Sequence, residues 1–227
     1  MVLQPRLRAL HKLAATDNGC VIVVVEGPSA AGKTTWTARH CDPAVVVAET
    51  TAAEAAAAPD QRADPRGAAE FWARINSARW ERAQRVEEAF GVAVCDSDPF
   101  KLHYAWTRWR TGHATRDDWT CALEASRRAF DAGRLGLADL ILVTIPGTQT
   151  LRRRREGDRG RRRRNFDLHV QLAGALAEWY RAVERLDPAR VIWQLPPAGL
   201  PGTLPAREPR SGARLLDALL AGLPSRD

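Results

Sequence analysis

The stretch EGPSAAGKTTW, residues 26–36, follows directly on the apolar run CVIVVV. Residues 27–34 match the pattern G-x-x-x-x-G-K-[ST] in full, between a strand-like run and a sequence compatible with a helix. In a loop of this kind the backbone N–H groups surround a phosphate, the lysine reaches its oxygens and the threonine hydroxyl can bind Mg²⁺. The stretch therefore predicts nucleotide binding after the first strand of a sheet.

The predicted phosphate site uses most of this loop. Lys33 is expected to act in catalysis and Thr34 to be a metal ligand, because an ammonium and a hydroxyl suit those two tasks. The residues expected to hold the nucleotide are Gly27, Ser29, Ala30, Ala31, Gly32, Lys33, Thr34 and Thr35.

Length and charge bound the class of protein. A chain of 227 residues with 45% hydrophobic content fits one domain over residues 1–227, with small inserted lids. The formal net charge is +7, but residues 152–164 alone hold nine arginines against Glu156 and Asp158. Because the rest of the chain is balanced, we expect no specific nucleic-acid partner.

The cysteines and the apolar runs indicate a compartment. The four cysteines show neither close pairing nor metal-type spacing, which favours free thiols in a reducing cytoplasm. No apolar run approaches the roughly 20 residues that cross a bilayer, so we expect no membrane association. Nothing in the sequence indicates an oligomeric state.

Alternation of apolar runs with helical patterns predicts the fold. Strand-like runs occur at residues 21–25, 44–48, 92–95, 140–145 and 191–193. Amphipathic helices are expected at residues 71–90, 168–186 and 213–220, with the proline-rich segment 196–212 as the connection to the last one. This order predicts an α/β fold of three layers, with about five parallel strands and helices on both faces.

Three carboxylates follow the second and third predicted strands. Glu49 ends VVVAE, and Asp96 and Asp98 end VCDSD. Ligands of parallel sheets bind beyond the carboxyl ends of the strands, where such groups can hold Mg²⁺ or accept a proton from a hydroxyl. We expect Asp96 to be catalytic and a metal ligand, and Glu49 and Asp98 to bind substrate. Asp98 could instead be only the N-cap of a helix over 100–109, because Pro99 follows it.

The arginine block follows the fourth predicted strand. In that position kinases carry a lid whose arginines close on a transferred phosphoryl group. Segment 146–166 is therefore predicted to be a lid, with Arg153 and Arg163 in catalytic positions. The alternatives are a solvated face or a patch that binds nucleic acid.

Aromatic residues gather near the third predicted strand. Residues 99–130 are expected to form helices around an acceptor pocket, in which Tyr104 and Trp106 could stack on a flat ring. Core packing explains most of the other aromatic side chains in this part of the sequence. His103 and His113 lie there too, but isolated histidines are more often hydrogen-bonded or surface residues.

The ordered set EGPSAAGKTT, VVVAET, VCDSDPFKLHYAW and an arginine lid resembles the P-loop nucleoside and small-molecule kinases. Residues 21–193 resemble the ribosylnicotinamide kinase domain of bacterial NAD regulator proteins and, more loosely, the chloramphenicol phosphotransferases. The resemblance implies that Lys33 and Thr34 hold phosphate and Mg²⁺, and that Glu49, Asp96 and Asp98 contact the acceptor or the metal. The chain lacks the adenylyltransferase domain of the regulators and the Glu-Arg-Ser signature of deoxynucleoside kinases.

These features predict an enzyme that transfers the γ-phosphoryl group of ATP, with Mg²⁺, to a hydroxyl of a small acceptor. The acceptor would be a nucleoside-like or sugar-like molecule or an antibiotic. The alternative from another class is a regulatory P-loop NTPase that acts on a protein or nucleic-acid partner, with the arginine block as its docking patch.

Overall fold

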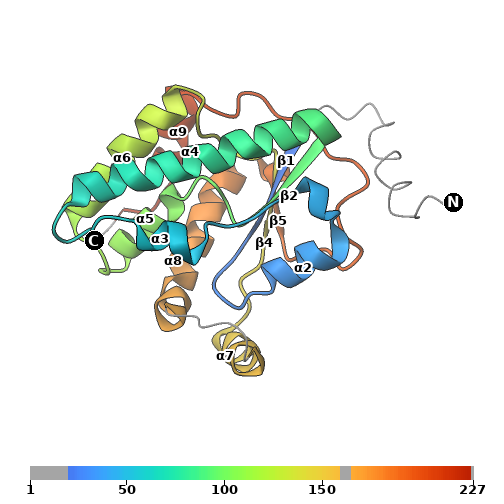
Figure 1. The fold of residues 1–227 in the computed structure, drawn as a ribbon, viewed down its shortest axis with the longest axis horizontal. Helices are drawn as coiled ribbons and strands as arrows, with labels where there is room; N and C mark the ends of the chain where they lie inside the picture. Colours follow the sequence, from blue (N-terminus) through green and yellow to red (C-terminus); the bar gives the residue numbers. More distant parts are fainter. Residues whose placement is uncertain (1–19, 159–164, 226–227) are drawn as a thin grey trace, which may run out of the picture.

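The fold is built on one all-parallel sheet with the strand order β2-β3-β1-β4-β5. A computed structural model describes residues 20–158 and 165–225 (Figure 1). The strands are β1 (Val21–Glu26), β2 (Val46–Val47), β3 (Val92–Asp96), β4 (Leu140–Val143) and β5 (Val191–Trp193). The five predicted strands and the α/β class are therefore confirmed.

Helices connect these strands and cover both faces of the sheet. They are α2 (Lys33–His40), α3 (Ala52–Ala56), α4 (Pro65–Phe90), α5 (Leu102–Arg110), α6 (Arg116–Asp131), α7 (Thr148–Gly157), α8 (Phe166–Leu186) and α9 (Ala213–Ala221). Short 3₁₀ turns at Pro43–Val45 and Pro188–Arg190 lead into β2 and β5.

The hydrophobic core on one face of the sheet is larger than the core on the other face. Ile22, Val24 and Ile141 face a large core that includes Trp80 of α4, together with residues of α5, α6, α8 and α9. The neighbouring strand residues point to the other face, where Trp36 of α2 and Leu204 of the proline-rich segment cover them. Strands buried on both faces explain why their sequences are continuous apolar runs instead of alternating ones.

Strand order positions the site. β1 lies between β3 and β4, so the chain leaves the carboxyl end of β1 at the point where the order of the sheet reverses. Val25 pairs with Asp96, and Glu26 pairs with Val143. The ends of three strands thus meet at one edge, which is where parallel sheets bind ligands.

Several element boundaries differ from the predicted ones. α4 begins at Pro65, six residues before the predicted start, because Asp64 caps it by accepting a hydrogen bond from Gly67 N at 2.8 Å. Gly91 ends this helix with φ of 76°, as a glycine C-cap does. β2 is shorter than predicted because its first residues form a 3₁₀ turn.

All four cysteines are free thiols, as predicted. Among the described residues, no helix is both long and apolar enough to cross a membrane.

The buried carboxylate of Asp139 connects the proline-rich segment to the amino-terminal ends of the strands through hydrogen bonds. Asp139, which is 0% exposed, accepts hydrogen bonds from Ile22 N at 2.7 Å and from Arg207 N at 2.8 Å. Arg210 lies 2.7 Å from the same carboxylate and also pairs with Glu87 at 2.6 Å. Asp139 therefore joins β1, β4 and the segment that leads to α9.

We predict that Asp139→Ala lowers the free energy of unfolding by about 1–3 kcal/mol, because it leaves the buried Ile22 N–H without its acceptor and removes one of the two carboxylates that pair with Arg210. Urea denaturation followed by circular dichroism measures this change. Asp217→Ala is the control: Asp217 pairs with Arg127 on the surface and is 60% exposed, so its loss should cost less than about 1 kcal/mol. Equal effects of the two substitutions would contradict the role given to Asp139.

Candidate active site

The predicted phosphate loop joins β1 to α2 in a tight backbone path. A Cβ atom on Gly27 would lie 2.1 Å from Thr144 O, so only glycine allows the loop to pass the end of β4. Ala30 has φ of 67° and Gly32 has φ of 100°, so the residues on either side of Ala31 within the loop both have left-handed values. Gly32 then becomes the N-cap of α2. The loop therefore has the geometry that directs backbone N–H groups at an anion.

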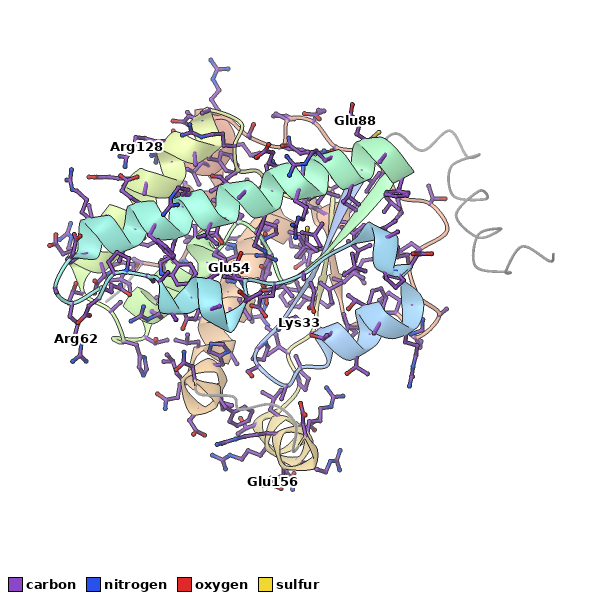
Figure 2. The ribbon with its side chains drawn as sticks, viewed as in Figure 1. Lys33, Glu54, Arg62, Glu88, Arg128 and Glu156 are labelled. Carbon is purple, nitrogen blue, oxygen red and sulfur yellow. The ribbon has the colours of Figure 1, made fainter. Side chains whose placement is uncertain are left out.

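Lys33 begins α2 (Figure 2), and it lines a large cleft. Its ammonium donates to Gly27 O at 2.6 Å, and it lies 3.9 Å from Glu26 Oε1. The cleft has a volume of about 1380 Å³ and is lined by all the loop residues predicted to hold the nucleotide. A pocket for one small ligand typically measures roughly 300–1,000 Å³, so this cleft has room for two.

Thr34 and Asp96 lie together, as their predicted shared role as metal ligands requires. The Thr34 hydroxyl donates to Asp96 Oδ2 at 2.7 Å. Asp96 is 7% exposed, and its other oxygen, Oδ1, has no hydrogen-bond partner among the described residues. Burial raises the pKa of Asp96, and the nearby carboxylates of Glu49 and Glu26 raise it further. The hydrogen bond from Thr34 and the charge of Lys33 lower this pKa but do not outweigh those effects.

A hydroxyl beside a carboxylate with a vacant lone pair suits Mg²⁺. Within the described residues, no group of three or more histidine, cysteine, aspartate or glutamate side chains could hold a metal. Mg²⁺ is compatible with this, because it often takes only one or two protein ligands and completes its shell with water and phosphate oxygens. The donor set therefore fits a magnesium ion that arrives with a nucleotide.

Glu26, the last residue of β1, is the buried centre of the site. Its Oε1 accepts a hydrogen bond from Gly27 N at 2.7 Å, and its Oε2 accepts from Asp98 N and from the Ser97 hydroxyl, both at 2.9 Å. Burial on its own would raise the pKa of Glu26, but the charges of Lys101 and Lys33 hold it well below its usual range. One ionised carboxylate thus joins the phosphate loop to the loop that follows β3.

Lys101 connects Glu26 to the carboxylate of Glu49. Its ammonium lies 3.4 Å from Glu26 Oε2 and 3.5 Å from Glu49 Oε1. Glu49 is half-exposed and lines the cleft. Burial would raise the pKa of Glu49, but Lys101 and Lys33 outweigh it and leave this carboxyl more acidic than an ordinary glutamate.

The end of the cleft opposite α2 is walled by α5 and α8, which lie on the other side of the phosphate loop (Figure 1). Tyr104 and His169 pack edge to face there, with ring centroids 5.7 Å apart. His103 is buried and donates a hydrogen bond from Nδ1 to Phe100 O at 3.1 Å, and its pKa is lowered to about 4, mainly by burial. α5 thus supplies part of the predicted acceptor wall, whereas no residue of α6 lines the cleft.

Two predicted substrate-binding residues lie away from the cleft lining. Trp106 is 1% exposed and packs in the main core. Asp98 is 2% exposed, and its two oxygens accept from Phe100 N at 2.8 Å and from the Tyr180 hydroxyl at 3.0 Å. Burial and the nearby Glu26 raise the pKa of Asp98 to about 7. Asp98 does not cap α5 either, because that helix begins at Leu102 with Lys101 as its N-cap.

The arginine block begins as helix α7, which contacts the phosphate loop. Leu151 of α7 packs with Ala30, Ala31 and Phe166. Arg154 donates to Ala31 O at 2.6 Å and lines the cleft. The outer side of α7 carries Glu156, which faces away from the sheet (Figure 2).

Of the two arginines predicted to be catalytic, the described part of the chain includes only Arg153. Arg153 is exposed and is not among the residues that line the cleft. Arg163 lies outside the described residues. Arg154, one position further along the helix than Arg153, is the arginine of α7 that donates a hydrogen bond to the loop.

Sequence reasoning missed Glu26, Lys101 and Arg154. A glutamate directly before the first loop glycine was a usable signal, because it ends a buried strand where a charge needs partners. Lys101 is one of only three lysines in the chain and follows the third strand closely. Nothing local distinguishes Arg154 from the arginines beside it.

Comparison with known proteins identifies the fold. Two solved structures of deoxyadenosine kinase from M. mycoides are similar to this chain, each with 13% sequence identity and a TM-score of 0.50. The one with bound dATP is matched over 99% of its length and 88% of this chain. The one with bound dCTP is matched over 88% of its length and 76% of this chain.

The sequence matches no protein-family model and no curated protein. The structural similarity shows that the chain has the P-loop nucleoside kinase fold, which agrees with the broader of the predicted resemblances. The narrower resemblances, to NAD regulators and to chloramphenicol phosphotransferases, stay predictions.

We predict that Gly27→Ala distorts the phosphate loop, because the added methyl group would overlap Thr144 O. Overpacking of this kind costs about 1–3 kcal/mol of stability and should weaken the binding of ATP, as measured by isothermal titration calorimetry. Gly174→Ala in α8 is the matched control, since no atom lies within 4 Å of its added Cβ. ATP binding by Gly27→Ala protein that equals that of the control would contradict the proposed loop geometry.

Proposed function

We propose that this protein is an ATP-dependent kinase that phosphorylates a hydroxyl group of a nucleoside-like small molecule. The observation that carries this proposal is the shared cleft: a phosphate loop and an ionised, half-exposed carboxylate, Glu49, line the same cavity at the ends of parallel strands. The fold of nucleoside kinases supports the same function.

The loop side of the cleft would bind the phosphoryl donor. Backbone N–H groups of residues 27–34 would hold the β-phosphate, and Lys33 would move from its contact with Gly27 O to the phosphate oxygens. Thr34 and Asp96 would hold Mg²⁺, directly or through water, and the ion would supply positive charge beside the phosphates. Arg154 is close enough to the loop to contribute a further positive charge.

The acceptor would occupy the side formed by α5 and α8. Glu49 suits the role of general base better than Asp96, because it lines the cleft and is kept ionised by two lysines. In the reaction the acceptor oxygen would form a bond to the γ-phosphorus while the bond from that phosphorus to the bridging oxygen breaks. ADP would leave, and the hydroxyl proton would pass to the Glu49 carboxylate.

The charges on the acceptor side favour an acceptor without phosphate or carboxylate groups. Lys101, the lysine on this side, is already paired with both Glu26 and Glu49 and is therefore not free to pair with an anionic acceptor. Burial lowers the pKa of His103 and of His169, so these two side chains add no positive charge at neutral pH. A nucleoside meets less repulsion in this site than a nucleotide does, and the edge of the Tyr104 and His169 pair could pack against its base.

We predict that ADP release rises with added acceptor when nucleosides, vitamins, sugars and antibiotics are screened with ATP and Mg²⁺. Lys33→Ala should abolish that acceptor-dependent release, with a larger loss of rate than of ATP affinity, since backbone groups still bind phosphate. Release of ADP that ignores every small acceptor but responds to a protein or nucleic acid would support a regulatory NTPase instead.

The two candidate carboxylates should differ in kinetics. Glu49→Gln should lower kcat by about 10²–10⁴-fold with little change in the Mg²⁺ requirement, because it removes the proton acceptor. Asp96→Asn should instead raise the Mg²⁺ concentration needed for half-maximal rate. Glu81→Gln is the control, as Glu81 is 67% exposed on α4 and outside the cleft. If Asp96→Asn instead lowered kcat at saturating Mg²⁺ and Glu49→Gln did not, Asp96 would be the proton acceptor and the assignment to Glu49 would be wrong.

A further inference from the structure

Lys101 has an unusual position between two carboxylates that differ in burial. The side chain of Glu26 is 4% exposed, whereas that of Glu49 is 53% exposed, and Lys101 lies within 3.5 Å of both. Lys101 also donates a hydrogen bond to the Ser97 hydroxyl, which in turn donates to Glu26. The ammonium is therefore held from the buried side of the site.

The two carboxylates depend on Lys101 to different degrees. Glu26 has further donors, because Gly27 N and Asp98 N both bond to it. For Glu49, Lys101 is the hydrogen-bond donor found among the described residues. Glu49 lies two residues beyond the end of β2, outside the hydrogen-bonded ladder of the sheet. Lys101 is thus the described group that contacts the Glu49 carboxylate and could set its direction.

We propose that Lys101 is the positioning residue of the acceptor site: anchored on Glu26, it orients the Glu49 carboxylate toward the acceptor hydroxyl. The expected effects on reaction rate rest on the proposed function. The electrostatic coupling between Lys101 and Glu49 does not depend on it. Lys101 acts through Glu49 and needs no contact of its own with the reacting atoms.

Charges around Glu49 set the direction of the expected effect. It is faced by Lys101 before α5, Lys33 of α2, Glu26 of β1 and Arg79 of α4. After burial, which raises the pKa of Glu49, Lys101 has the largest influence and lowers it. Removal of the Lys101 charge must therefore raise the pKa of Glu49, and the acid limb of the pH profile moves to higher pH.

The kinetic test uses Lys101→Gln and Lys101→Arg, each in the wild-type and in the Glu49→Gln background. For Lys101→Gln we expect the acid limb of kcat/KM to move up by about 1 pH unit or more, with a fall in kcat. Lys101→Arg, which keeps the charge, should restore most of the rate. In the Glu49→Gln background the same substitutions should change little, because residues that act through one another are not additive.

Failure of the kinetic test has a clear form. An unshifted acid limb in Lys101→Gln protein would overturn the inference. So would an equal loss of rate in both backgrounds, which would mean that Lys101 contacts the acceptor or phosphate directly.

A second measurement needs no acceptor and no activity. Carboxyl ¹³C NMR can follow the titration of Glu49 in the unliganded protein, with Glu49→Gln to assign its signal; Lys101→Gln should raise its pKa. The reciprocal experiment uses Glu49→Gln, which alters an exposed side chain and should fold normally. Because Glu49 and Glu26 raise the pKa of Lys101 against its burial, Glu49→Gln should lower the pKa of Lys101, measured by ¹⁵N NMR of its ammonium.

The two proposals can thus fail separately. A protein that phosphorylates no acceptor but shows both reciprocal shifts would contradict the proposed function and retain the coupling. Unchanged titration of Glu49 and of Lys101 in these variants would overturn the inference, whatever the activity of the wild-type protein.

Discussion

The buried carboxylate of Glu26 is the interaction on which the site depends. It ends the central strand at the point where the sheet order reverses, and its two oxygens face opposite halves of the cleft. A buried charge is stable only where hydrogen bonds and opposite charges replace water. Gly27 N, Asp98 N and Lys101 provide that replacement, so the charge fixes the phosphate loop and the loop after β3 relative to each other.

The rest of the cleft follows from this anchor. On one side the loop leads to Lys33 and to the pair formed by Thr34 and Asp96, which suit a nucleotide with its magnesium ion. On the other side Lys101 extends the network to Glu49, at the mouth of the cleft. Phosphoryl transfer needs these two functions within one cavity, because little covalent chemistry is left to the protein beyond positioning and charge.

Local sequence patterns predicted the fold, whereas long-range contacts determined where several side chains of the site lie. Five apolar runs and the loop pattern were sufficient for the parallel sheet and for the position of the loop after β1, since burial and backbone path act over a few residues. Asp98, which we expected to bind substrate or to cap a helix, instead accepts a buried hydrogen bond from Tyr180, 82 residues away in the sequence. The contact of Lys101 with Glu26 spans 75 residues, and only the fold brings it about. The side of α7 that faces the loop, and hence the choice of Arg154 over Arg153, likewise depends on the packing of Leu151.

Hydrogen–deuterium exchange of a Glu26→Ala variant tests the central claim most directly. Gly27 N and Asp98 N both lose their acceptor in this variant, so the account predicts that both amides exchange faster than in the wild-type protein. The amide of Val23, in the middle of β1, should keep its protection because its strand contacts are unchanged. Unchanged exchange at Gly27 and Asp98, or faster exchange at only one of them, would contradict the claim that Glu26 joins the two halves of the site.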